Sequence, residues 1–172
     1  MKTPMQTCLA IVVACCAAMS FPVKADETTT AIESKIQATG LKYSKTESGD
    51  FRFLFDEGDG RSQLVIVNGS ATSYHDAQFV EIWSKSVASE MRPVNTNQMR
   101  ELLATTDGGV IGGGELGHWC LIKPSESGKK WHLYYSIHIP ITGSPDAFEA
   151  AIRECSTKAD GKEKELVGTD EN

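Results

Sequence analysis

The chain has 172 residues, with 23 acidic and 17 basic side chains and a formal net charge of −6 at pH 7. This length suffices for one domain with its own hydrophobic core and not comfortably for two. The acidic balance argues against nucleic acid and anionic membranes as partners, because both require a basic binding surface.

Residues 1–25 are typical of a secretory signal peptide, with cleavage predicted after Ala25. Lys2 supplies a positive charge, and an apolar run extends from Cys8 to Met19. That run is shorter than the roughly 20 residues that a membrane-spanning helix requires. We therefore expect a periplasmic or secreted protein, with no membrane partner after cleavage.

Two alternatives stay open for this N-terminal segment. It could remain uncleaved as an anchor, or the lipobox-like residues 12–15 could carry a lipid on Cys15. The apolar run continues past Cys15, which weakens the lipoprotein alternative. Cleavage after Ala25 would remove two of the 17 basic residues, Lys2 and Lys24, and would bring the net charge to −8.

The first predicted helix begins at Thr30 and ends before Gly40. Thr30 and Glu33 have the spacing of a capping box, and Ile32 and Ile36 share one helical face. Gly40 is typical of the residue that follows a helix. Residues 26–29 are expected to be a frayed N-terminus.

Three strands are predicted next: one that begins at residues 41–43 and ends at the turn 47–50, and two at residues 51–55 and 62–67. Phe51, Phe53 and Phe55 alternate at the strand period of two, which predicts one buried side. The turn residues 56–60 predict an antiparallel hairpin. Residues 68–76 are ambiguous and are expected to be a loop with a short bridge.

A fourth strand is predicted at residues 79–87, with a helix as the alternative. A second helix is predicted at 95–103, since Asn95 can cap it and Gln98 occupies the capping-box position. Six of the ten residues from Gly108 to Gly117 are glycines, a pattern typical of an edge strand, a bulge or a loop. Strands are predicted at 119–122 and 131–139.

The last helix has the clearest signals. Ser144 is a good N-cap, Pro145 suits the first helical position and Asp146 complements the positive helix end. An apolar stripe follows at the spacing i, i+3, i+4, i+7, formed by Phe148, Ala151, Ile152 and Cys155. Residues 26–166 are thus predicted to form one α+β domain with an antiparallel sheet, in the order α-β-β-β-(β)-α-β-β-β-α, and residues 167–172 a disordered tail.

These elements resemble the YbjN-like family of putative bacterial sensory transduction regulators, over most of the chain after residue 30. The resemblance is carried by residues 41–61, 80–87 and 95–103, and by the strand 131–141 that precedes the capped Ser144 helix. It implies a fold similar to that of type III secretion chaperones. It also implies a binding module that holds extended polypeptide and can form a homodimer, without catalytic residues.

Candidate chemistry is sparse. Cys120 and Cys155 could form a disulfide in an exported chain, or could be two separate thiols. His118 and Cys120 share one strand face, but their spacing of about 6.5–7 Å argues against a direct thiol–imidazole pair. The four histidines lack the spacing of a metal motif. The sequence therefore predicts no catalytic residue, no metal ligand and no cofactor.

We expect a non-enzymatic protein- or peptide-binding module of regulatory or chaperone-like role. Its binding edge is predicted around Gly112, Gly113, Gly114, Trp119 and Trp131. The alternatives are a hydrolase or metal-dependent enzyme with an unrecognised site, and a small-ligand sensor of the cell envelope.

Overall fold

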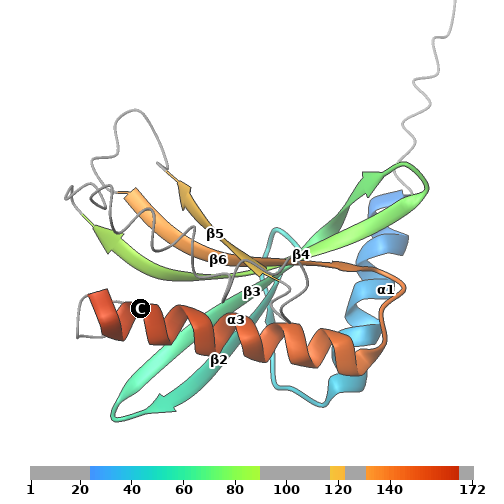
Figure 1. Ribbon diagram of the computed structural model, residues 1–172. Coiled ribbons are helices and arrows are strands. Elements are labelled where there is room, and N and C mark those ends of the chain that lie inside the picture. The colour runs from blue at the N-terminus through green and yellow to red at the C-terminus, as the bar shows by residue number, and fades with distance from the viewer. Residues whose placement is uncertain (1–23, 90–116, 123–130, 167–172) are drawn as a thin grey trace, which may run out of the picture.

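The computed structural model describes residues 24–89, 117–122 and 131–166. They form a six-stranded antiparallel sheet with two helices packed against it (Figure 1). The fold class is therefore α+β, as the sequence predicted. The elements are α1 (Lys24–Thr39), β1 (Ser44–Lys45), β2 (Phe51–Gly58), β3 (Arg61–Tyr74), β4 (Ala77–Ser89), β5 (Gly117–Ile122), β6 (Trp131–Pro140) and α3 (Pro145–Leu166).

The strands follow the order β1-β2-β3-β4-β6-β5 across the sheet. The predicted hairpin of β2 and β3 is confirmed, and its turn residues Asp59 and Gly60 both have positive φ, as a type I′ turn requires. A second hairpin joins β3 to β4 through His75 and Asp76. Because β6 pairs with both β4 and β5, β5 lies at the end of the sheet that the described residues form.

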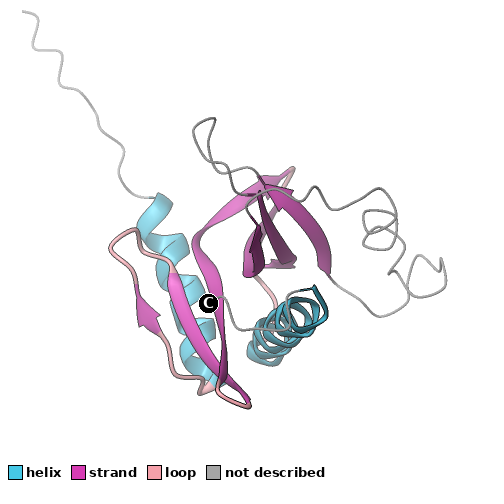
Figure 2. Ribbon diagram, turned by 90° about the vertical axis from the view of Figure 1, so that its left-hand side faces the viewer, coloured by secondary structure: helices cyan, strands magenta, loops and turns pink. Residues whose placement is uncertain are grey.

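Both helices pack against the same face of the sheet. α3 runs along that face in Figure 1 and is seen nearly end-on in Figure 2. The predicted apolar stripe of α3 is confirmed, since Phe148, Ala151, Ile152 and Cys155 are all fully buried. They share one core with Ile32 and Ile36 of α1 and with side chains of four strands, among them Phe51, Phe53, Val65, Ile82, Tyr135 and Ile137. The burial of this shared apolar surface is what holds the layers together.

The C-terminal half of α3 is held by polar contacts. Arg61 at the start of β3 lies 2.6 Å from the carboxylate of Asp160. Ser86 of β4 donates a hydrogen bond of 2.9 Å to the carbonyl oxygen of Ala159. The buried carboxylate of Glu163 lies 3.8 Å from Arg61. The charged segment after Ala159 therefore remains part of α3 and stays packed on the sheet, because β3 and β4 supply polar partners for it.

The predicted start of the first helix was wrong. α1 begins at Lys24, and Thr30 lies inside it. Glu33 does not close a capping box: its carboxylate accepts hydrogen bonds from the Tyr43 hydroxyl and from Lys45. Thr29, expected to be frayed, donates a hydrogen bond of 2.6 Å to the carbonyl oxygen of Gly69. Contacts to distant strands therefore order the turn before Thr30.

The loop predicted at residues 68–76 was wrong for residues 68–74, because β3 continues to Tyr74, and only His75 and Asp76 form a turn. Residues 68–74 are mostly polar and show no alternation of apolar side chains, so the sequence alone did not indicate a strand there. They form one because this part of β3 pairs with β4. The register shifts between Val67 and Ala71, which marks a bulge. The strand predicted to begin at residues 41–43 begins instead at Ser44, as the two-residue β1. The predicted helix at 95–103 and the tail at 167–172 lie outside the described residues.

Candidate functional site

The edge strand β5 is the first part of the candidate site. Its six residues pair with β6 in a regular antiparallel register that has no bulge. Trp119 lies on the core side of β5 and its ring stands 5.0 Å from that of Tyr135. The opposite side of β5 carries His118, Cys120 and Ile122, by the alternation of a strand.

The two edges of the sheet differ in how they are protected. β1 consists of two residues, and its Lys45 is held in an ion pair with Glu33 at 2.7 Å. Shortness and lysine are two of the devices by which proteins blunt a sheet edge. β5 has the sequence Gly-His-Trp-Cys-Leu-Ile, without proline, lysine or acidic residues. Among the strands that the structure describes, β5 is therefore the better edge for accepting another strand.

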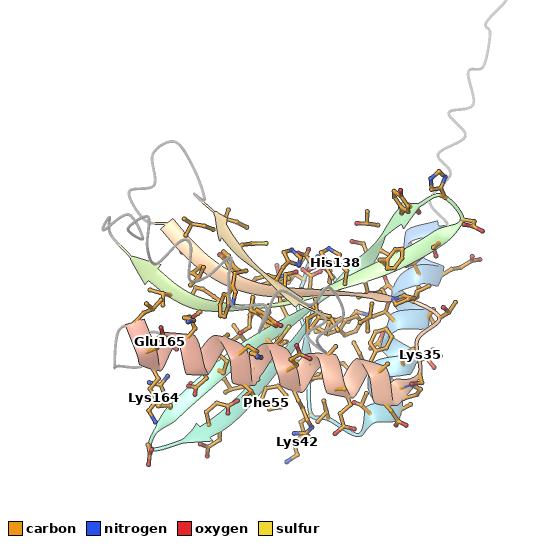
Figure 3. All side chains as sticks on the ribbon, viewed as in Figure 1. Lys35, Lys42, Phe55, His138, Lys164 and Glu165 are labelled. Carbon is orange, nitrogen blue, oxygen red and sulfur yellow. The ribbon has the colours of Figure 1, made fainter. Side chains whose placement is uncertain are left out.

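The second part of the candidate site is the far face, which we define as the sheet face opposite α3. His138 projects from this face (Figure 3). The register places Glu81 of β4 opposite His138, and Trp83 opposite Ser136 of β6. Alternation along the strands brings side chains of β3, β4, β6 and β5 to this one face.

A chain of hydrogen bonds crosses three strands of the far face. Trp83 Nε1 donates to Asn68 Oδ1 at 3.0 Å, and Asn68 Nδ2 donates to Glu81 Oε2 at 3.0 Å. Ser136 Oγ donates to Glu81 Oε1 at 2.9 Å. The rings of Trp83 and Tyr134 meet edge to face at 5.3 Å. Both oxygens of the Glu81 carboxylate are thus held in a fixed position at the centre of this face.

This network was missed by the sequence analysis. Glu81 alternates with Val80 and Ile82 inside a predicted strand, so its place on the opposite face could have been inferred. Its partners could not, because Asn68 lies in the segment that was expected to be a loop, and Ser136 lies on a strand far along the chain.

The two cysteines lie on opposite sides of the sheet and both are free thiols. Cys155 is fully buried under α3, and its Sγ donates a hydrogen bond of 3.4 Å to the carbonyl oxygen of Ile82. Cys120 lies on the far face, opposite Tyr134. The structure therefore does not bring the candidate disulfide partners together.

Among the residues that the structure describes, none activates the Cys120 thiol. Burial raises the pKa of the Cys120 thiol, and the negative charge of Glu81 raises it further. A nucleophilic cysteine requires the opposite shift, since the thiolate is the reactive form. The ring of His118 stacks on His138, with 5.6 Å between the ring centroids. These contacts do not favour a His118–Cys120 catalytic pair.

The other predicted site residues have the following positions. Trp131 begins β6, where it pairs with Ser89 of β4. Gly112, Gly113 and Gly114 lie outside the described residues. Within residues 24–89, 117–122 and 131–166, no group of three or more histidine, cysteine, aspartate or glutamate side chains is placed to hold a metal ion.

Neither described helix is long and apolar enough to cross a membrane. Comparisons of the chain with protein-family models, with curated proteins and with solved structures find no match.

Proposed function

We propose that this protein is an exported, non-enzymatic module that binds an extended segment of polypeptide by adding it as a strand to the β5 edge. The observation that carries the proposal is the position of β5, which pairs with β6 on one side and ends the described sheet. Strand addition gives affinity through main-chain hydrogen bonds, and the side chains that flank the edge give specificity.

The composition of β5 supports this use of the edge. An uncharged, regular edge strand is a liability that proteins usually remove, unless the edge is used. Ile122 on β5 is 49% exposed, although it is a large apolar residue. A guest strand beside β5 would cover such apolar surface.

The resemblance to the YbjN-like family and to the type III secretion chaperone fold points to the same function. Chaperones of that fold hold extended polypeptide and are commonly dimers. A second copy of this chain could pair through the same edge in a two-fold arrangement. The proposed role is therefore regulatory or chaperone-like, with a protein or peptide as the partner.

Export is part of the proposal. The apolar run of residues 8–19 and the site at Ala25 support a cleaved signal peptide and a periplasmic or secreted protein. N-terminal sequencing of the protein from the envelope or medium should find Asp26 first. An intact Met1 would contradict export by cleavage, and a lipid on Cys15 would make the protein a lipoprotein.

The edge is tested by two matched lysine substitutions. Ile122→Lys places a charge on the far-face side of β5, and Leu54→Lys places one on the interior strand β2, where the side chain is 72% exposed. Peptides selected from a random 12-residue display library on the wild-type protein serve as probes. Fluorescence anisotropy measures their affinity, and sedimentation measures the dimer.

Ile122→Lys should weaken binding of the selected peptides by tenfold or more, and Leu54→Lys should leave it unchanged. Amide hydrogen exchange should show protection of residues 117–122 when a peptide is bound. Failure to select any peptide, or equal binding by both variants, would refute the proposed edge. Loss of a dimer in Ile122→Lys alone would instead identify a second copy as the occupant.

A further inference from the structure

Two histidines form a pair on the far face. His118 lies on β5 and His138 on β6, and their ring centroids are 5.6 Å apart with the ring planes inclined by 13°. His118 is in register with Ser136, so His138 is its diagonal neighbour, two residues further along β6. Both imidazoles are exposed, and they can therefore change rotamer without disturbing the core.

The separation of the pair suits a shared metal ion. Imidazole nitrogens bind zinc at about 2.0–2.1 Å, so two nitrogens on one ion stand roughly 3.3–4.2 Å apart, from tetrahedral to linear geometry. Each ring nitrogen lies about 1 Å from its ring centroid by covalent geometry. Parallel rings with centroids 5.6 Å apart can reach that spacing by tilting toward each other.

The surroundings of the pair favour a cation. Glu81 of β4 is directly across from His138, and the hydrogen bonds that its carboxylate accepts from Ser136 and Asn68 hold it on this face. A fixed negative group beside two imidazole rings raises the local affinity for a positive ion. Because both carboxylate oxygens of Glu81 already accept hydrogen bonds, we expect Glu81 to attract the metal ion electrostatically and not to coordinate it.

We propose that His118 and His138 form a two-ligand binding site for a divalent transition metal ion, such as Zn²⁺ or Cu²⁺, with water completing the coordination. Imidazole suits these ions, whereas Ca²⁺ and Mg²⁺ require oxygen ligands. Since no third ligand is preassembled among the described residues, the expected dissociation constant is on the order of 10 µM, far weaker than that of a structural zinc site.

The bound ion would link β5 to β6. A ligand that binds only the folded chain raises its stability in proportion to RT ln(1 + [L]/Kd). Zinc should therefore raise the melting temperature of the protein, and this effect should require both histidines. The inference does not depend on peptide binding at the β5 edge.

The test compares three histidine variants of the chain, made without a histidine tag. His118→Ala and His138→Ala each remove one proposed ligand. His75→Asn is the control, since His75 lies in the β3–β4 turn with φ 53°, a conformation that asparagine tolerates. Isothermal titration calorimetry with Zn²⁺, Cu²⁺, Ca²⁺ and Mg²⁺ measures affinity and stoichiometry, and circular dichroism without metal checks that each variant is folded.

We expect the wild type and His75→Asn to bind one Zn²⁺ or Cu²⁺ with equal affinity and to show no heat with Ca²⁺ or Mg²⁺. His118→Ala and His138→Ala should each bind at least tenfold more weakly and lose the zinc-dependent rise in melting temperature. The proposal is overturned if the wild type binds more weakly than about 100 µM. It is equally overturned if either alanine variant binds like the wild type, or if His75→Asn loses binding.

Discussion

The ring of Tyr135 occupies the space that a side chain on Gly117 would need. A Cβ atom built on Gly117 would lie 2.4 Å from Cζ of Tyr135, well inside van der Waals contact. Tyr135 is fully buried, and its hydroxyl donates a hydrogen bond of 2.9 Å to Glu154 of α3. The first residue of the edge strand is thus fixed by a ring that also joins the sheet to the helix.

We therefore predict that Gly117→Ala destabilises the protein by about 1–3 kcal/mol, because the Tyr135 ring must move out of a packed position. The control is Gly161→Ala in α3, where an added Cβ would meet no atom within 4 Å. That substitution should stabilise the protein by about 0.5–1 kcal/mol through helix propensity. Urea unfolding measures both. Equal effects of the two substitutions would show that the Tyr135 contact does not constrain Gly117.

A second prediction concerns the docking of α3 through Phe148, which is fully buried in the shared core. Phe148→Ala should lower the free energy of unfolding by about 3–5 kcal/mol, since it removes a buried ring and leaves a cavity. Leu54→Ala, on an exposed side chain of β2, should change it by less than about 0.5 kcal/mol. A loss below about 1 kcal/mol for Phe148→Ala would contradict the docking.

The third prediction compares the stabilities that two ion pairs involving α3 contribute, one of them mostly buried and the other exposed. Arg61 and Asp160 are only 11% and 17% exposed, whereas Arg153 and Glu149 are 55% and 35% exposed. Asp160→Asn should cost about 2 kcal/mol, less than the 3–5 kcal/mol of a fully buried pair, because Glu163 stays 3.8 Å from Arg61. Glu149→Gln should cost less than about 0.5 kcal/mol. Equal losses in thermal unfolding would show that burial does not strengthen the Arg61 contact.

The sequence was most informative where one local pattern decides the structure. Ser144 caps α3 as predicted, and the backbone N–H of Ala147 donates to its hydroxyl at 3.2 Å. The alternation of Phe51 and Phe53 placed both in the core for the same reason. Such signals need only the residues of the element itself.

Distant contacts explain what the sequence did not predict. The first part of α1 is held by the hydrogen bond from Thr29 to the carbonyl oxygen of Gly69. Asn68 can donate a hydrogen bond to Glu81 only because β3 pairs with β4. The stacking of His118 on His138 depends on β5 lying beside β6 in the sheet. Alternation along one strand predicts which side chains share a face, but it does not predict which strands lie next to each other. The contacts between side chains of the far face could therefore not be predicted from the sequence.

The fourth prediction concerns the thiols. Burial raises the pKa of the Cys155 thiol far above its ordinary value, and the side chain is fully covered. Cys120 is partly exposed, with a smaller rise in pKa caused mainly by burial. Iodoacetamide should therefore modify Cys120 slowly at pH 7 and faster as pH rises, because more thiolate forms. Cys155 should react only after unfolding, as peptide mass spectrometry can show. Modification of Cys155 in the folded protein would disprove its burial.

The fifth prediction is a pH dependence at the junction of α1 and β1. The hydrogen bond from Lys45 is the main cause that holds the pKa of Glu33 below its ordinary value. Desolvation is the next largest effect and opposes it, while the hydrogen bond from the Tyr43 hydroxyl and the charge of Lys45 lower the pKa further. A lowered pKa in the folded chain means that the carboxylate form stabilises the fold. This stabilisation is fully present above the ordinary value of 4.5 and is lost as pH falls through the lower, folded pKa.

Glu33→Gln should therefore destabilise the protein at pH 7 and have a smaller effect at pH 3, which lies below the ordinary pKa of 4.5. Because the pair is exposed, added salt at pH 7 should also reduce the difference between the two proteins. Urea unfolding at both pH values, in low and high salt, measures these differences. A difference that is the same at pH 7 and pH 3 would show that the Glu33 charge does not stabilise this junction, and that the hydrogen bonds of the side chain act without it.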